Sequence, residues 1–264
     1  MEINTTKETL NISKIVNERK EIIDIQGDMI VPDSKPDILN TINTSGNVCI
    51  YKKEIMDGKI KLDGNILTYI MYLADSVNAE QNDNIRGLNT NLDFSETINI
   101  PDLESGMNAD IIPKIKLIEC KVINGRKIGI KVTLEIQVRV YLQESIDIVT
   151  ELNNPNIQVL NKKMKINSLL GSGMTKASIK ENISIPNTDN LAEILSVQIC
   201  LVDKDIKTSY NKILAKAEVE IKMVYLTEDG RICNFGGRLP LVGFIDMPNI
   251  KEKNICEMMY SIKN

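Results

Sequence analysis

The feature that most constrains this chain is an unbroken alternation of apolar and mostly polar residues in "KIGIKVTLEIQVRVYLQ", residues 127–143. A period of two predicts a β-strand, because successive side chains of a strand point to opposite faces of its sheet. At roughly 3.3 Å per residue the strand would reach about 50 Å, well beyond an average strand. A strand of this kind requires an equally long apolar surface to cover it.

The residues before this strand predict its partner. Asn124-Gly125 is the strongest short hairpin signal, because both central residues of the favoured turn need a positive φ. We therefore expect "IKLIECKVINGRK" to lead into a long two-stranded ribbon. Since an isolated ribbon is only marginally stable in water, its apolar face must lie on another part of the fold.

Most of the remaining pattern also predicts strands. Residues 45–56 and 59–74 alternate around the turn at Asp57-Gly58, and residues 92–100 form a further strand. Helix is expected only as one or two turns at 36–42 and again at 190–196. In both stretches Pro, Asp or Asn stands near the start, where free backbone N–H groups favour a cap.

Three blocks of the sequence recur in the same order, which indicates an internal duplication. "DILNTI" is followed later by "AEILSV", and "GKIKLDGNILTYIMYL" by "NKILAKAEVEIKMVYL". Tyr72 corresponds to Tyr225, an offset of 153, while Pro101 corresponds to Pro248, an offset of 147. The offset between matching residues changes by only a few residues, and the change falls in turns. We therefore infer duplicated modules of about 80–100 residues each.

This pattern gives the predicted organisation and fold class. The chain is expected to be all-β with minor α, made of two repeated antiparallel β-sandwich or barrel-like modules joined by a long β-ribbon. The predicted parts are an N-terminal arm, a first module, the ribbon with its connector, and a second module, at residues 1–20, 21–105, 106–162 and 163–264.

Composition excludes several kinds of partner. The net charge of −4 leaves no basic footprint for nucleic acid. The densest apolar stretch, residues 64–74, is too short to cross a bilayer, and residues 1–16 lack the basic start and apolar block of a signal peptide. We expect synthesis in the cytoplasm and no membrane insertion.

Enzymatic activity is not expected. The chain has no histidine, so the usual general base and the usual metal ligand are both absent. "LLGSGMTKAS" lacks the spacing of a phosphate-binding loop. The residues therefore predict no catalytic site, no cofactor and no metal. The carboxylates expected to be solvated or to cap turns are Asp33, Asp37, Asp57 and Asp63.

Carbohydrate binding is a further option, but only 4% of residues are aromatic and none is tryptophan, which disfavours a sugar-stacking platform.

The five cysteines are widely spaced and contain no Cys-x-x-Cys pair. Buried thiols that act as small apolar side chains are the expected state. Because the number is odd, an intermolecular disulfide formed later in an oxidising environment stays open as an alternative. The candidate cross-linking residues are Cys49, Cys120, Cys200, Cys233 and Cys256.

The remaining basis for a function is the shape of the protein and the surfaces through which it could assemble. A two-module β-protein has sheet edges that must be blunted or used. We expect the ribbon, the polar arm or both to add to a neighbouring copy by strand addition, and successive contacts that do not close would build a filament. The alternative is that the arm is disordered.

The repeated blocks also resemble a known family. "VPDSKPDIL", "GNVCIYKKEIMDGKIKLDGNILTYIMYLAD" and "FSETINIP" resemble the SPOCS domain, a module of proteins from spore-forming Firmicutes. The ribbon and the later "IKENISIP" fit the arrangement of two such modules in one chain, so the resemblance covers nearly the whole sequence. The second module departs from the pattern at "NTDNLAEIL", where the second Pro-Asp is absent.

The resemblance implies a structural role. The chain is similar to the ribbon protein of clostridial spore appendages, which implies a self-assembling subunit of a spore surface layer or appendage filament. It would be made in the mother-cell cytoplasm and deposited on the spore surface, in coat, exosporium or appendage. The alternative is a coat morphogenetic adaptor similar to SipL that binds another coat or exosporium protein; such adaptors carry a LysM domain, which these residues do not include.

Overall fold

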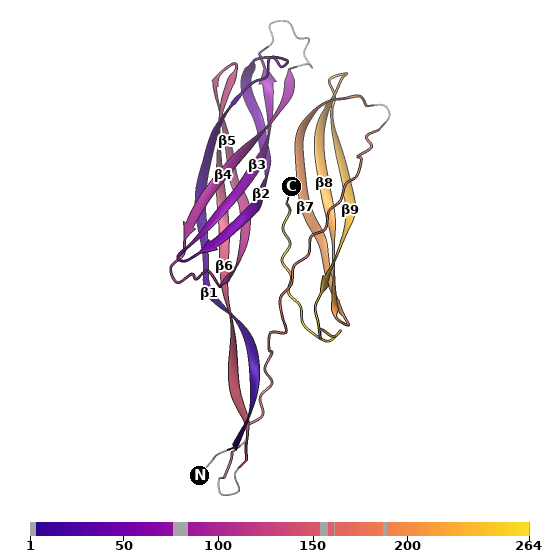
Figure 1. Ribbon diagram of the computed structural model, residues 1–264. Helices are drawn as coiled ribbons and strands as arrows, with labels where there is room; N and C mark the ends of the chain where they lie inside the picture. The colour runs from indigo at the N-terminus through magenta and orange to yellow at the C-terminus, as the bar shows by residue number, and fades with distance from the viewer. Residues whose placement is uncertain (1–3, 76–83, 154–157, 161, 187–188, 264) are drawn as a thin grey trace.

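The computed structural model describes residues 4–75, 84–153, 158–160, 162–186 and 189–263. Within these residues all regular structure is antiparallel β-sheet, which confirms the predicted all-β class. The strand orders β1-β6-β5, β2-β3-β4 and β7-β8-β9 define sheets A, B and C (Figure 1). The strands are β1 (Asn4–Ile30), β2 (Ile38–Met56), β3 (Lys59–Ala74), β4 (Ile85–Asn99), β5 (Asn108–Asn124), β6 (Lys127–Asn153), β7 (Leu191–Ser209), β8 (Lys212–Thr227) and β9 (Ile232–Asp246).

Sheets A and B pack face to face and form lobe one. The alternation that predicts β6 places its apolar side chains against those of β3, and both sets are enclosed. Ile66 of β3 and Leu134 of β6 are each 0% exposed. The long apolar surface that β6 requires is therefore sheet B.

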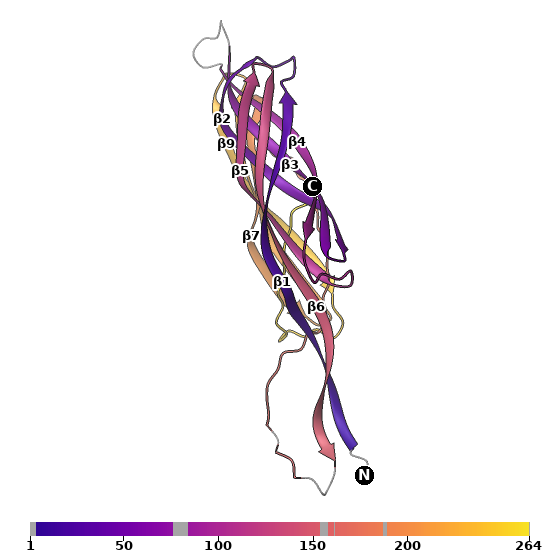
Figure 2. The same cartoon turned by 90° about the vertical axis from the view of Figure 1, so that its left-hand side faces the viewer.

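Sheet A contains both the predicted ribbon and the predicted arm. The Asn124-Gly125 turn joins β5 to β6, and β1 pairs with β6 from Asn4 to Ile30. The ladder between β5 and β6 ends at Asn108 opposite Tyr141, so β6 continues with β1 alone. This end of β1 and β6 projects past both lobes (Figures 1 and 2).

Sheet C repeats sheet B strand for strand. β2 and β7 have 19 residues each, β3 and β8 have 16, and β4 and β9 have 15. The turns repeat as well: Asp102 and Asn249 follow the third strand of each sheet with φ values of 65° and 67°. The duplication seen in the sequence is thus a duplication of a three-stranded sheet.

The predicted helical turns at 36–42 and 190–196 are wrong. Ile38 begins β2 opposite Ala74, and Leu191 begins β7 opposite Thr227. Pairing with a neighbouring strand outweighs the local preference of a few residues for a helix cap. The minor α component of the predicted fold class is absent from the described residues.

Sheet C docks through the start of β7 on the outer face of sheet B. The hydroxyls of Ser45 and Ser196 lie 2.7 Å apart, and the Gly87 N–H donates to Glu193 Oε2 at 2.6 Å. Leu195 is buried at this contact. We term sheet C and the segments on it lobe two. Among the described residues no helix is long and apolar enough to cross a membrane.

Candidate assembly surface

Equivalent faces of sheets B and C differ in how well they are covered. In lobe one this face lies under sheet A, and its central side chains are buried. In lobe two the same positions are only half-buried. The buried members are Ile66, Thr68, Leu92 and Phe94, and their half-buried counterparts, termed the acceptor face, are Val219, Ile221, Leu239 and Leu241.

In lobe one this face is covered by the three strands of sheet A. β1 crosses β4, where Arg19 Nη1 donates to the Asn99 carbonyl at 2.7 Å. β5 lies along β2, where the Thr44 hydroxyl donates to the Ile118 carbonyl at 3.0 Å. β6 runs between them in the order of sheet A. The centre of the face is therefore covered by β6.

In lobe two an extended segment takes the place of β1. Residues 162–186, termed the strap, precede β7 as β1 precedes β2, and they cross β9 (Figure 1). A Cβ on Gly173 would lie 2.6 Å from the Ile245 side chain, and one on Gly171 would lie 2.9 Å from the Met247 sulfur. These close approaches leave little room for a larger residue at either position, so the strap is fitted to the β9 side of the sheet.

The C-terminal segment takes the place of β5. Residues 251–263, termed the tail, follow β9 after the same kind of turn that separates β4 from β5. Their contacts lie on the β7 and β8 side: Thr208 Oγ1 donates to the Glu252 carbonyl at 3.0 Å, and the Tyr260 hydroxyl to the Lys216 carbonyl at 3.3 Å. Cys256 packs against the Ile213 cluster.

No described segment takes the place of β6 in lobe two. The strap and the tail have no strand ladder with each other or with any other described residues. Half-buried apolar side chains are left at the centre, and Ile199 beside them is 37% exposed. Lobe two is thus a sheet with two flanking covers and an uncovered middle.

The projecting end of sheet A carries a second exposed apolar surface. The strap contacts this end at its side, where the Leu169 N–H donates to the Asn11 carbonyl at 2.6 Å and Gln143 Nε2 donates to Ser172 Oγ at 3.4 Å. We term residues 143–153 of β6, together with 4–13 of β1, the donor end. Ile146 is 44% exposed there, although it shares its strand face with the buried Val138. In the described residues β6 pairs on one side only along this stretch.

The carboxylates singled out in the sequence hold turns. Arg126, in the β5–β6 turn, donates to Asp33 Oδ1 at 2.9 Å and to Asp37 Oδ1 at 3.1 Å. The Asp57 carboxylate accepts from the Ser105 N–H at 2.8 Å, and that of Asp63 accepts from the Ser95 hydroxyl at 2.6 Å. Arg126 was not expected from the sequence, since nothing local links it to the Pro-Asp block.

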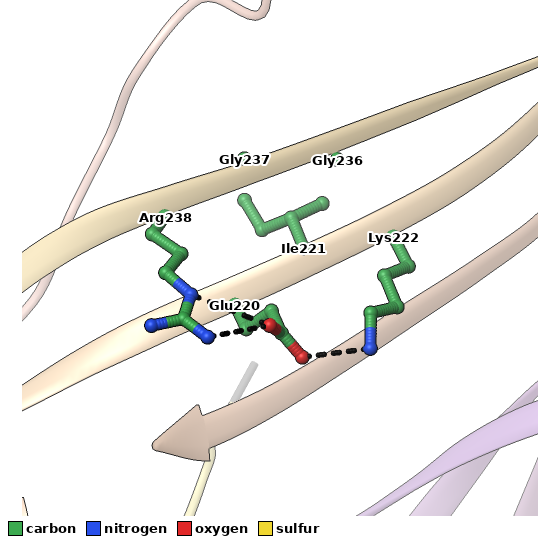
Figure 3. Close-up of a pocket in the computed structure, with 6 residues that line it drawn as sticks. All are labelled: Glu220, Ile221, Lys222, Gly236, Gly237 and Arg238. Atoms are coloured by element: carbon green, nitrogen blue, oxygen red, sulfur yellow. Dashed lines mark hydrogen bonds and ion pairs between the residues drawn. The ribbon is translucent and has the colours of Figure 1, made fainter. Parts of the chain in front are cut away.

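A hollow of about 230 Å³ lies on lobe two, lined by residues 220–222 of β8 and 236–238 of β9 (Figure 3). Its charged groups satisfy one another: Lys222 Nζ lies 2.9 Å from Glu220 Oε2, and Arg238 Nη2 donates to Glu220 Oε1 at 3.2 Å. These hydrogen bonds, that from Lys222 first, lower the pKa of the Glu220 carboxyl, so it stays ionised. Among the described residues no cluster of acids or cysteines is arranged to hold a metal ion.

The five cysteines lie apart and form no disulfide. Cys49 in β2 is buried, whereas Cys200 in β7 is exposed, and the other three are intermediate. Burial raises the pKa of the Cys120 thiol to about 11 and also raises that of Cys256. The thiolate is the reactive form, so the raised pKa values make Cys120 and Cys256 less reactive. Cys200 is the exposed one of the five and is therefore the best placed to meet another molecule.

Fold and surface together define a class: an all-β protein built by duplicating one three-stranded sheet. A family model described as "SipL, SPOCS domain" matches residues 37–123 and 190–264, more than half of the chain. The chain belongs to this SPOCS-domain family and is a sporulation-related protein. No curated protein and no solved structure matches it.

The two matched stretches follow the duplication. The first runs from the turn before β2 through most of β5, and the second runs from just before β7 through the tail. The tail thus falls in the part of the family module that β5 occupies in lobe one. β1 and β6 lie outside both matched stretches.

Proposed function

We propose that this protein is a self-assembling structural subunit of a bacterial spore surface layer or appendage filament. One observation carries the proposal: the central positions of the face that is buried in lobe one are half-buried in lobe two, although both sheets have the same strands. An apolar face of this kind is stabilised by covering it, because burial of apolar area is the main favourable term in association.

Two further features support assembly from identical copies. The chain carries an uncovered face on lobe two and an uncovered strand end on sheet A, and these are different surfaces. A contact between two different surfaces is heterologous, so it repeats from copy to copy and builds an open filament if the rotation does not close. Assembly would then need no second protein.

We further propose that the protein is not an enzyme and needs no cofactor. The acids at the Pro-Asp block and in the hollow on lobe two are paired with bases, and the sequence has no histidine. We also propose deposition on the spore, in coat, exosporium or appendage, and membership of a sporulation family supports this location.

Electron microscopy and sedimentation velocity of the purified 264-residue chain test the proposal. Filaments or a concentration-dependent series of oligomers are expected. A chain that stays monomeric at high concentration, both with and without oxidant, contradicts it. In that case a pull-down from sporulating cells that retrieves one stoichiometric, different partner would favour the adaptor role, in which the acceptor face takes a strand of another coat protein.

A further inference from the structure

We propose that the outer end of β6, residues 143–153, enters the acceptor face of a second copy beside its tail, with the paired residues 4–13 of β1 on the strap side. There it takes the position that β6 holds over sheet B in lobe one. This inference rests on the proposed function, because it names the two surfaces through which copies join. Its occupant is one defined segment of this same chain.

The first argument is the strand order of lobe one. Sheet A places β6 between β1 and β5. In lobe two the strap lies at the β1 position and the tail at the β5 position, and no described strand lies between them. Cys256 comes ten residues after the end of β9, as Ala109 comes ten after the end of β4, and both face the core cluster of their lobe. The position that lobe two leaves uncovered is therefore that of a β6-like strand.

The second argument is backbone pairing. Beyond Tyr141, β6 pairs with β1 on one side. Its other edge, which β5 occupies from Lys127 to Tyr141, has no described strand partner there. The tail is an extended segment in the β5 position without a ladder. Antiparallel pairing of the tail with the outer end of β6 would satisfy both backbones by strand addition. It would continue along β6 the ladder that β5 begins.

The third argument is the face on which the side chains lie. Ile146 and Ile148 continue the even-numbered face of β6, whose members from Ile128 to Val140 are buried on sheet B. On the donor end the same face is only partly covered: Ile146 is 44% exposed and Ile148 is half-buried. Placed on a second copy, this face would cover Val219 and its neighbours as the buried part of the same β6 face covers sheet B in lobe one.

Charge favours the same pairing. Residues 143–153 contain three acids, Glu144, Asp147 and Glu151, and no base. The strap brings Lys176 and Lys180 across lobe two, and the tail brings Lys253 and Lys263. Opposite charges on the two surfaces steer encounter and disfavour other registers.

A second copy is required because the donor end extends beyond its own sheet C. Figures 1 and 2 show the outer ends of β1 and β6 continuing past the ends of β7 to β9. The inner half of β6 is fixed in the core of lobe one, with Leu134 and Ile136 at 0% exposure. Each copy therefore donates at one end and accepts at the other, which gives a head-to-tail chain.

The test uses one donor variant, one acceptor variant and a control on the same strand as each. The donor variant is Ile146→Asp with Ile148→Asp, and its control is Val149→Asp, which changes an apolar residue that is 54% exposed on the opposite face. The acceptor variant is Leu239→Asp, and its control is Val242→Asp, 46% exposed on the outer face of β9. Circular dichroism establishes that each variant is folded, and sedimentation velocity and electron microscopy measure assembly.

The donor and acceptor variants are each expected to stay monomeric, and both controls are expected to assemble as the wild type does. Mixed together, the two defective variants should form 1:1 dimers that do not extend, because each supplies the surface that the other has lost. If the folded donor variant assembles as the wild type does, or if Val242→Asp alone blocks assembly, the proposed contact is wrong. Wild-type protein that never assembles would instead contradict the proposed function itself.

Discussion

The Tyr225 hydroxyl donates a hydrogen bond of 2.7 Å to Asp189 Oδ2, whereas Tyr72, its counterpart in lobe one, donates to the Pro36 carbonyl at 3.1 Å. The duplicated position thus anchors a charged partner in lobe two and a neutral one in lobe one. The hydrogen bond from Tyr225 is the largest cause of a lowered pKa at the Asp189 carboxyl. The two lobes should therefore differ in their response to acid.

Lobe two is expected to lose stability below about pH 4. A carboxyl whose pKa is lowered by folding stabilises the fold above its unfolded pKa, and this contribution is lost as pH falls through the folded pKa. Tyr225→Phe removes the largest cause of the lowered pKa at Asp189, so the fall in melting temperature between about pH 5 and pH 3 should become smaller. Tyr72→Phe is the control and should leave the acid response of the wild type unchanged.

Alkaline solution should affect both lobes. The bond to Asp189 raises the pKa of Tyr225 to about 12, and burial raises that of Tyr72 to about 12. Stability from a raised tyrosine pKa is complete below pH 10 and is lost as pH rises toward 12. Thermal melts from pH 9 to 12 should fall in the wild type. Each Phe variant should fall less steeply, and equal slopes in all three proteins would contradict the assignment.

A further prediction concerns Arg126, which binds the turn before β2. Its guanidinium donates to the carbonyls of Val31 and Lys35 at 2.9 and 2.8 Å as well as to Asp33 and Asp37. Since the group is 34% exposed, we expect Arg126→Ala to lower the free energy of unfolding by about 1–2 kcal/mol in urea melts.

The neighbouring Lys127 provides the control for Arg126. It pairs with Asp28 at 2.6 Å, but both side chains are well exposed. Lys127→Ala should therefore cost less than about 0.5 kcal/mol. Equal effects of the two substitutions would mean that the four bonds to the turn contribute no more than one surface ion pair.

Arg126 also illustrates what the sequence could and could not predict. The alternation of β6, the Asn-Gly turn and the repeated blocks follow local rules, and the structure has strands where they predict them. The Pro-Asp block predicts a helix cap, because capping is a local rule too. Its partner lies about 90 residues away in the chain, so no local pattern contains it.

The same reasoning applies to β1 and to lobe two. β1 shifts register against β6 at Thr6/Lys7 and at Ile15/Asn17, which breaks its period of two, so only pairing with β6 defines it as one strand. The half-buried acceptor face follows from what covers β8 and β9, whereas their own sequences match β3 and β4. Periodicity predicts which side chains share a face, but it does not predict what lies on that face.

Another prediction compares equivalent core positions. Ile66 is 0% exposed beneath β6, whereas Val219 at the same place in lobe two is half-buried. Ile66→Ala should cost about 2–5 kcal/mol of unfolding free energy, since a cavity is left in an enclosed core. Val219→Ala should cost about 1 kcal/mol in the monomer, because less apolar area returns to water. Chemical denaturation at a concentration too low for assembly measures both.

Assembly should increase the cost of Val219→Ala. If the acceptor face is covered in the assembled protein, Val219→Ala weakens association as well as folding, and the critical concentration for assembly rises. Ile66→Ala should leave that concentration near the wild-type value at temperatures where lobe one stays folded. An equal cost of both substitutions in the monomer would show that the centre of lobe two is as well covered as that of lobe one.

The last prediction concerns the cysteines. In native protein a maleimide should label Cys200 first, because it is exposed, and Cys49 slowest, because it is 3% exposed. Cys120 should also react slowly at neutral pH, since burial raises the pKa of its thiol to about 11. Mass spectrometry of timed samples measures the order, and denatured protein, in which all five react alike, is the control.

The labelling order decides which residue to test for cross-linking. If oxidised assemblies give a ladder in non-reducing electrophoresis, Cys200→Ser should remove it, and Cys49→Ser, which changes a buried thiol, should keep it. A disulfide between copies requires two thiols whose Cα atoms come within about 7 Å, so a ladder also restricts how neighbouring copies lie. Assemblies that give no ladder under oxidant are held together without cysteine, by strand pairing and apolar contact alone.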